Sequence, residues 1–98
     1  MATLVVAYPK SEGATFDRAY YMHTHMKLVA DAWTEHRLMG FEILFPSDET
    51  QAFATVAVLR FAGQASIDAA LGSDRTAEVM ADIAKFTNIT PLLHRVGD

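Results

Sequence analysis

The sequence contains no cysteine, which excludes disulfides, thiolate nucleophiles and zinc–sulfur sites. Basic residues are also few, since eight Lys and Arg stand against twelve Asp and Glu and the net charge is −4. Nucleic-acid phosphates attract a basic face, so this balance argues against DNA or RNA as a partner. No apolar run approaches the roughly 20 residues of a membrane span, and the first residues lack the pattern of a signal peptide. We therefore expect a cytoplasmic protein without a membrane partner.

Polar surface residues are also scarce for so short a chain. The 98 residues are 51% hydrophobic, with a mean hydropathy of +0.13. We expect one domain over residues 1–98, because the length suits one and no linker or low-complexity segment interrupts it. A small domain has much surface and little interior, so the excess of apolar residues predicts an oligomer interface.

The spacing of apolar residues predicts an α+β fold. Alternation and β-branched residues predict strands over 3–8, 41–45, 53–61 and 89–96. Helical periodicity predicts one long region from a cap at Thr15 to Gly40, irregular near His25, and a split region over 64–71 and beyond a cap at Ser73 or Asp74. This order is the ferredoxin-like βαββαβ pattern, a four-stranded antiparallel sheet with both helical regions on one face.

Both faces of the predicted strands are apolar. In the strand over 53–61, one set of side chains contains Phe53, Leu59 and Phe61, and the opposite set contains Val56 and Val58. Helices can cover only one sheet face, whereas a half-exposed strand normally alternates apolar and polar residues. We therefore predict a homodimer in which the uncovered faces of two sheets pack together. A partly exposed apolar face is the alternative.

The segment over 16–28 holds the densest group of polar and aromatic residues. His23 and His25 point to opposite sides of a helix, and neither has an Asp or Glu three or four residues away, so we predict no metal site. Tyr21 and His25 are four residues apart and share a helical face. His25 is therefore the best candidate for proton transfer, with a buried histidine bonded to backbone as the structural alternative.

Other residues carry weaker indications. His94 belongs either to a pocket or to an interface, and Trp33 either lines a cavity or lies in the core. In the last helix Val79, Met80, Ile83 and Ala84 are expected to face inward, whereas Glu78, Asp82 and Lys85 are expected to face water. The sequence has no nucleophile turn, dinucleotide fingerprint or haem attachment motif, so no cofactor is predicted.

Two segments together resemble the EthD family. The first is Ala7-Tyr8-Pro9-Lys10 followed by Phe16-Asp17-x-x-Tyr20-Tyr21-x-x-x-His25-Met26-x-Leu28-Val29, and the second is the tail over 81–91. Lys27 stands where the family usually has proline. The resemblance implies a dimeric α+β barrel with a pocket between sheet and helices. It also implies His25 as the acid or base, with Tyr20 and Tyr21 as pocket neighbours.

The resemblance says less about the reaction. The type member is linked to bacterial breakdown of a fuel ether, and relatives with the same barrel include cofactor-free monooxygenases, polyketide cyclases, isomerases and decarboxylases. We therefore expect a cofactor-independent enzyme or accessory protein acting on small apolar or aromatic compounds, with His25 as catalyst and Tyr20, Tyr21, Trp33 and His94 as substrate-binding candidates. Whether the protein is an enzyme stays open. The alternative is a module that sequesters a hydrophobic molecule, and a haem- or flavin-dependent oxygenase is less favoured.

Overall fold

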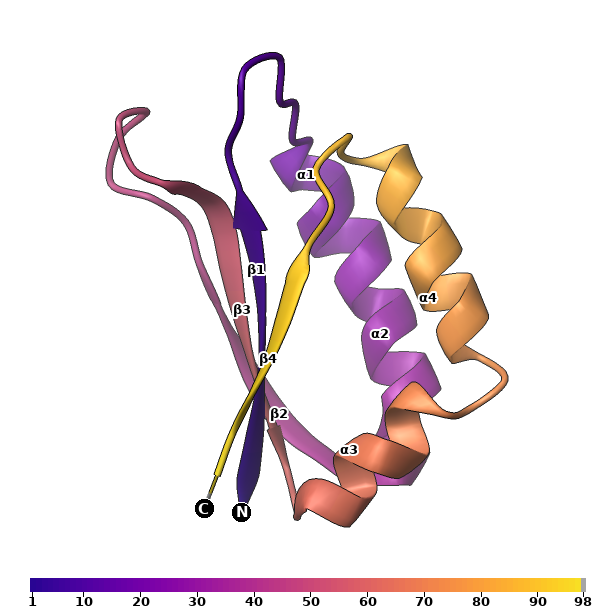
Figure 1. Cartoon of the computed structure of the whole chain (residues 1–98). Coiled ribbons are helices and arrows are strands. Elements are labelled where there is room, and N and C mark those ends of the chain that lie inside the picture. Colours follow the sequence, from indigo (N-terminus) through magenta and orange to yellow (C-terminus); the bar gives the residue numbers. More distant parts are fainter. Residues whose placement is uncertain (98) are drawn as a thin grey trace.

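A four-stranded antiparallel sheet carries all the helices on one face (Figure 1). The computed structural model describes residues 1–97, so Asp98 at the end of the expected domain lies outside the described residues. In chain order the elements are β1 (Ala2–Pro9), α1 (Arg18–Tyr20), the π-helical turn η1 (Tyr21–His25), α2 (Met26–Trp33), the 3-10 turn η2 (Thr34–His36), β2 (Leu38–Leu44), β3 (Phe53–Phe61), α3 (Gln64–Leu71), α4 (Thr76–Asp82), the 3-10 turn η3 (Ile83–Lys85) and β4 (Leu92–Val96).

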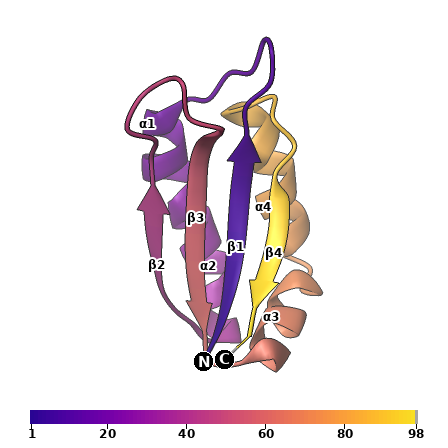
Figure 2. The same cartoon turned by 60° about the vertical axis from the view of Figure 1, so that its left-hand side comes forward.

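The strand order is β2-β3-β1-β4, with every neighbouring pair antiparallel (Figure 2). The two strands richest in β-branched residues, β1 and β3, lie at the centre, where both edges are hydrogen-bonded. This topology confirms the predicted ferredoxin-like fold. The strand over 53–61 has the predicted bounds, but β4 begins at Leu92 rather than at Ile89. Pro91 has no backbone N–H for a ladder, and Thr87 and Asn88 bond to another segment instead.

The long helical region begins and ends elsewhere than predicted. The cap is Asp17, whose carboxylate accepts a hydrogen bond from the Tyr20 backbone N–H, so the predicted cap at Thr15 was wrong. The region ends after η2, where Arg37 takes a left-handed conformation with φ of 65°. Gly40, the predicted end of the helix, lies within β2. Arg37 thus performs the reversal that glycine usually performs at a helix end.

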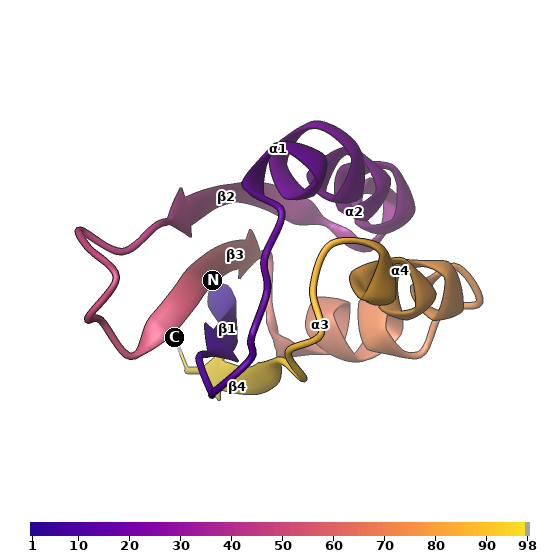
Figure 3. The same ribbon diagram turned by 90° about the horizontal axis from the view of Figure 1, so that it is seen from above.

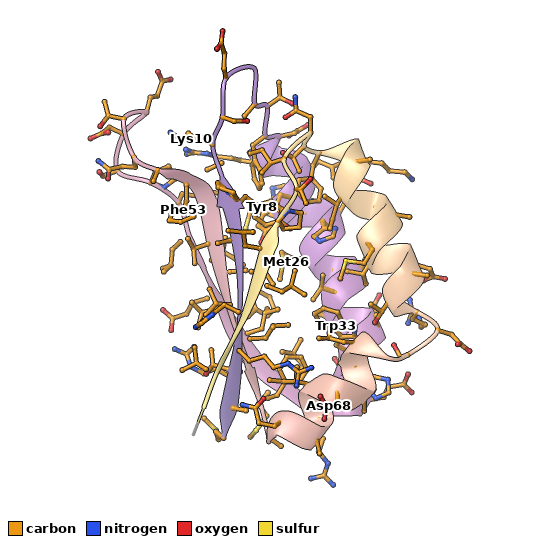
Figure 4. The ribbon with its side chains drawn as sticks, in the orientation of Figure 1. Tyr8, Lys10, Met26, Trp33, Phe53 and Asp68 are labelled. Atoms are coloured by element: carbon orange, nitrogen blue, oxygen red, sulfur yellow. The ribbon has the colours of Figure 1, made fainter. Side chains whose placement is uncertain are left out.

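The face of β3 toward the helices carries Leu59 and Phe61, which are 2% and 0% exposed. Val56 and Val58 lie on the opposite face, which settles which of the two predicted sets is left uncovered. Phe53, which was predicted to share a sheet face with Leu59 and Phe61, lies on the other face. The register shifts beside it, where Tyr8 pairs with Thr55 but Pro9 pairs with Phe53, and Figure 4 shows the Phe53 ring away from the helices. One extra strand residue inverts the alternation at that point.

The sheet face opposite the helices is called the open face below. Viewed from above, the helices all lie on the other side of the sheet (Figure 3). The register places Val5, Ala7, Val56, Val58, Leu92, His94 and Val96 side by side on it. Leu92 and Val96 are 57% and 42% exposed, and the ion pair of Arg60 with Glu42 lies toward one edge. None of the helices in residues 1–97 has the length and apolar character to cross a membrane.

Candidate functional site

A small cavity lies between the sheet and the helices. Its walls come from β1, η1, α2, β3, α4, η3, β4 and the residue before β4. The lining residues are Val6, Tyr8, Tyr21, His25, Met26, Val29, Trp33, Ala57, Leu59, Val79, Met80, Ile83, Pro91 and Leu93. Figure 4 shows Tyr8, Met26 and Trp33 in this space between the two layers. The volume open to the centre of a water molecule is about 30 Å³. In this conformation the cavity therefore has room for very few waters.

The mouth of the cavity lies between α4 and β4. A wider surface groove on that side shares four residues with the cavity, namely Met80, Ile83, Pro91 and Leu93. Met80 and Leu93 are 38% and 43% exposed, so they lie at the boundary between the cavity and solvent. A methionine side chain has three rotatable bonds and adapts its shape readily. The rotamer of Met80 therefore determines how far the cavity opens toward this groove.

The π-helical turn η1 brings His25 to the inner wall. Here the Met26 N–H bonds to the Tyr21 carbonyl five residues back, so the turn holds one more residue than an α-helical turn. The Tyr21 and His25 rings consequently stack, with centroids 5.6 Å apart and planes at 19°. The Phe86 ring lies 4.6 Å from His25 on centroids, and His25 is 3% exposed. The irregularity expected near His25 is therefore this turn.

Asp82 holds His25 from the neighbouring helix. His25 Nδ1 lies 3.0 Å from Asp82 Oδ2, and the Tyr20 hydroxyl donates to Asp82 Oδ1 at 2.7 Å. Asp82 is 8% exposed, so its expected position on the solvent side of the helix was wrong. The carboxylate accepts one hydrogen bond on each oxygen and links two segments 57 residues apart in the sequence. Below, Tyr20, Asp82 and His25 are called the triad.

The charges of the triad follow from burial and hydrogen bonding. Burial lowers the pKa of His25, and the hydrogen bond and charge of Asp82 offset this only in part. Burial acts to raise the pKa of Asp82, but the hydrogen bonds from Tyr20 and His25 outweigh it and the net pKa is lowered. At neutral pH Asp82 is therefore ionised and His25 neutral. Because the carboxylate accepts from Nδ1–H, the free lone pair of the imidazole lies on Nε2.

Backbone contacts fix the two halves of the triad relative to each other. The Asp17 N–H donates to the Phe86 carbonyl at 2.8 Å, and Phe16 pairs with Thr87 in an isolated antiparallel bridge. Asp17 starts the helix that carries Tyr20 and His25, whereas Phe86 follows the helix that carries Asp82. These backbone contacts therefore hold the start of the first helical region beside the end of the second.

Two further tyrosines lie beside the triad. Tyr8 and Tyr21 are 2% and 1% exposed, their rings lie 5.8 Å apart on centroids, and both line the cavity. Burial raises the pKa of both hydroxyls, so both keep their protons at neutral pH. Neither hydroxyl has a hydrogen-bond partner within residues 1–97, and His25 Nε2 has none there either.

Trp33 closes the other end of the cavity. Its indole Nε1 donates to the Thr76 hydroxyl at 2.9 Å, and that hydroxyl donates to the Ala70 carbonyl. Ser73 Oγ lies 3.1 Å from the same hydroxyl, and the Phe61 ring lies 6.1 Å from Trp33 on centroids. This end of the cavity is therefore apolar, and its few polar atoms are paired within the protein.

The candidate residues identified in the sequence do not all meet at the cavity. His25, Tyr21 and Trp33 line it, whereas Tyr20 does not and is connected to His25 through Asp82. His94 pairs with Val5 in the β1–β4 register and lies beside it on the open face, so the structure does not bring His94 to this site. Sequence reasoning missed Asp82 and Tyr8. Asp82 follows Val79 by three residues and precedes Phe86 by four, so the three lie along one helical face, which is buried. An acidic residue on an otherwise apolar face was the signal in the sequence that could have identified Asp82.

The described residues, 1–97, contain no group of three His, Asp or Glu side chains arranged to hold a metal ion. The chain matches no family model, and no curated protein matches it either. Solved structures, in contrast, resemble it over nearly its whole length.

An EthD-like protein from Ralstonia eutropha JMP134 shares 29% identity at a TM-score of 0.83, with 98% of this chain and 89% of that one covered. An ethyl tert-butyl ether D (EthD) family protein from Bacillus halodurans C-125 shares 17% identity at 0.76, with 100% and 98% covered. A dimeric ferredoxin-like protein of unknown function from Jannaschia sp. CCS1 shares 16% identity at 0.67, with 99% and 97% covered. The expected resemblance to EthD proteins is therefore confirmed by solved structures that this chain matches from end to end.

Proposed function

We propose that the protein is an acid–base catalyst for small apolar or aromatic compounds, with His25 as the proton-transfer residue. The observation that carries this proposal is the hydrogen bond between His25 Nδ1 and Asp82 at 3.0 Å. The other ring nitrogen of His25, Nε2, has no partner within residues 1–97. Asp82 fixes the tautomer and would stabilise the imidazolium formed when Nε2 takes a proton. The apolar cavity walls favour a substrate with little charge.

The proposed chemistry needs only proton transfer. His25 Nε2 removes a proton from a carbon next to a carbonyl group, the electron pair of that C–H bond becomes the C=C bond of an enolate, and the π pair of the carbonyl group moves onto its oxygen. The imidazolium then returns a proton to the same carbon or to a neighbouring position, which gives exchange or isomerisation. Asp82 stays ionised throughout, and no metal or organic cofactor takes part. Such a step would suit an enzyme or accessory protein in the degradation or modification of small organic compounds.

A simple ketone tests the proposal without knowledge of the natural substrate. Cyclohexanone in D₂O loses α-hydrogen when a base removes it, and NMR follows the loss. We expect the protein to accelerate this exchange beyond free imidazole at the same concentration, and His25→Gln to remove the acceleration. His23→Gln is the matched control, because His23 is exposed on the same turn. Equal exchange in the wild type and His25→Gln would refute catalysis by His25.

The second candidate is a module that sequesters a hydrophobic molecule. The small apolar cavity with a methionine at its mouth is compatible with that function. His25 and two tyrosines in the cavity wall weigh against it, because passive binding of an apolar ligand has no use for them. Mass spectrometry of material that copurifies with the protein would identify such a ligand. A purely hydrocarbon-like ligand together with no ketone exchange would favour this second candidate.

We also propose that the protein is a homodimer formed through the open face. The apolar side chains of Val56, Val58, Leu92 and Val96 support this proposal, since no part of residues 1–97 packs over them as the helices pack over the other face. Packing two such faces would remove the apolar surface from water. Light scattering should give twice the chain mass of 10.8 kDa. Val58→Asp should give monomers or aggregates, whereas Met22→Asp on an exposed helical position should leave the mass unchanged.

A further inference from the structure

The hydroxyl groups of two cavity tyrosines, Tyr8 and Tyr21, are unpaired within residues 1–97. Both side chains are almost completely buried, yet no residue within 1–97 bonds to either hydroxyl. Buried polar groups are nearly always paired, and an unpaired one lowers stability. Tyr20, next in the sequence to Tyr21, shows the ordinary case, because its hydroxyl donates to Asp82. Two unpaired hydroxyls on neighbouring rings indicate a partner from outside the chain.

The cavity is the place where these hydroxyls meet that partner. The fully enclosed side-chain atoms without a hydrogen bond in residues 1–97 are His36 Nε2 and Thr55 Oγ1, so neither tyrosine oxygen is sealed inside the protein. Both tyrosines line the cavity, and so does His25, whose ring stacks on Tyr21. The three polar side chains of the cavity thus lie together at one end, opposite Trp33.

We propose that Tyr8 and Tyr21 form a subsite that donates hydrogen bonds to an oxygen of the ligand, which places the ligand among small apolar carbonyl compounds. This inference deepens the proposed function, because the same oxygen would carry the negative charge after His25 removes a neighbouring proton. A neutral phenol group donates one hydrogen bond, and the raised pKa of both tyrosines keeps them in that state at neutral pH. Donors placed where charge develops stabilise an enolate more than they stabilise the starting carbonyl.

The chemical class of ligand follows from what the cavity offers. Its unpaired polar groups are two phenol hydroxyls, each able to donate one hydrogen bond, and the acceptor Nε2, and its remaining lining contains no charged side chain. A carboxylate or an ammonium group would therefore be buried without an opposite charge, which is costly. A ketone, aldehyde or ester suits the two donors, and its hydrocarbon part suits the wall formed by Val29, Leu59 and Trp33.

The test uses a pair of probes that differ only in the oxygen. Cyclohexanone accepts hydrogen bonds, whereas methylenecyclohexane has nearly the same shape and accepts none. We expect the wild type to bind the ketone more tightly in NMR titrations. Each single variant, Tyr8→Phe or Tyr21→Phe, should reduce this preference by about three- to tenfold, as expected for one lost hydrogen bond. The carbonyl stretch of the bound ketone should also move to higher frequency in both variants.

The control removes a buried hydroxyl that lies outside the cavity. Thr55 is 0% exposed, has an unpaired hydroxyl and does not line the cavity, so Thr55→Val should keep the full preference for the ketone. Both tyrosine variants should also be as stable as the wild type without ligand, because neither loses a hydrogen bond within the chain. A structural role would instead predict lower stability with unchanged preference.

The outcomes separate this inference from the proposed function. Equal binding of both probes by the wild type, or an unchanged preference in both tyrosine variants, overturns the subsite. His25-dependent hydrogen exchange could persist in that case. If ketone preference depends on the tyrosines but no exchange occurs, the subsite stands and catalysis by His25 fails.

Discussion

At the Trp33 end of the cavity every polar side chain has a partner within the protein, whereas at the His25 end three polar atoms have none within residues 1–97. Both ends are equally buried, since Trp33 is 2% exposed and His25 3%. Burial alone therefore does not distinguish a structural residue from a functional one. The difference lies in whether the buried polar atoms serve the fold, and a protein tolerates unpaired ones where a ligand will use them.

The largest expected effect on stability is at the Trp33 end of the cavity. Trp33→Ala should lower the free energy of unfolding by about 3–5 kcal/mol, because it removes a buried indole and leaves the cavity larger. Urea denaturation measures the change. If the two ends are independent, the pKa of His25 should stay where it is in the wild type. A shift of that pKa in a folded Trp33→Ala protein would show that the two ends are coupled.

Asp82→Asn should give the next largest effect. The carboxylate accepts from both Tyr20 and His25, and hydrogen bonds to a charged group contribute about 1.5–3 kcal/mol each, less where water competes. We expect a loss of stability at pH 7 toward the lower figure, since Tyr20 is only partly buried. The Asn amide has a single oxygen, so it can accept from only one of the two donors, and its NH₂ group faces the other. Urea denaturation of both proteins at a series of pH values measures this loss.

The stability of the protein should fall as the pH is lowered. The pKa of Asp82 is lowered on folding, so its stabilisation is present above the usual value of 3.8 and is lost as pH falls through the folded pKa. The pKa of His25 is also lowered, so folding is weakened as pH falls below the usual 6.5, where the unfolded chain gains a proton more readily. Both groups make the wild type less stable in acid. The stability difference between wild type and Asp82→Asn should therefore shrink below pH 3.8, and a constant difference would contradict the assigned charges.

The sequence predicted the parts of this comparison that depend on local pattern. Strand alternation gave the sheet and its open face, and helical spacing placed Tyr21 and His25 on one face. Contacts between residues far apart in the sequence could not be predicted from such patterns. Asp82 meets His25 because their two helices lie side by side, with the start of one hydrogen-bonded to the end of the other through Asp17 and Phe86, and no local pattern shows that contact. Tyr8 had the appearance of an ordinary strand residue, since nothing in its neighbours shows that its hydroxyl lacks a partner. The extra residue at Phe53 likewise broke the expected alternation.

Tyr20→Phe should change the acid–base properties of His25 more than the stability. Without the Tyr20 hydroxyl, the Asp82 carboxylate becomes a stronger acceptor and stabilises the imidazolium better, so the pKa of His25 should rise. Asp82→Asn should move the same pKa down, because it removes the negative charge. The other ionisable groups that face the triad are Tyr21, Tyr8 and Lys85, and all three are unchanged in both variants. NMR titration of the His25 ring protons measures both shifts, and shifts of the same sign would contradict the triad.

The smallest effect is expected at Thr55, and it is best measured against a second buried threonine, Thr76. Thr76 carries the hydroxyl that pairs with Trp33, and Thr55 carries one with no partner in residues 1–97. Thr76→Val should lower the free energy of unfolding by about 1–3 kcal/mol, because the Trp33 N–H is left without an acceptor. Thr55→Val has the same shape change and should be neutral or stabilising by up to about 1 kcal/mol, since an unpaired hydroxyl costs free energy to bury. Thermal and urea unfolding of the two variants give the contrast directly. If Thr55→Val were as destabilising as Thr76→Val, an unpaired buried hydroxyl would no longer indicate freedom from a structural role, and the same inference for Tyr8 and Tyr21 would lose its basis.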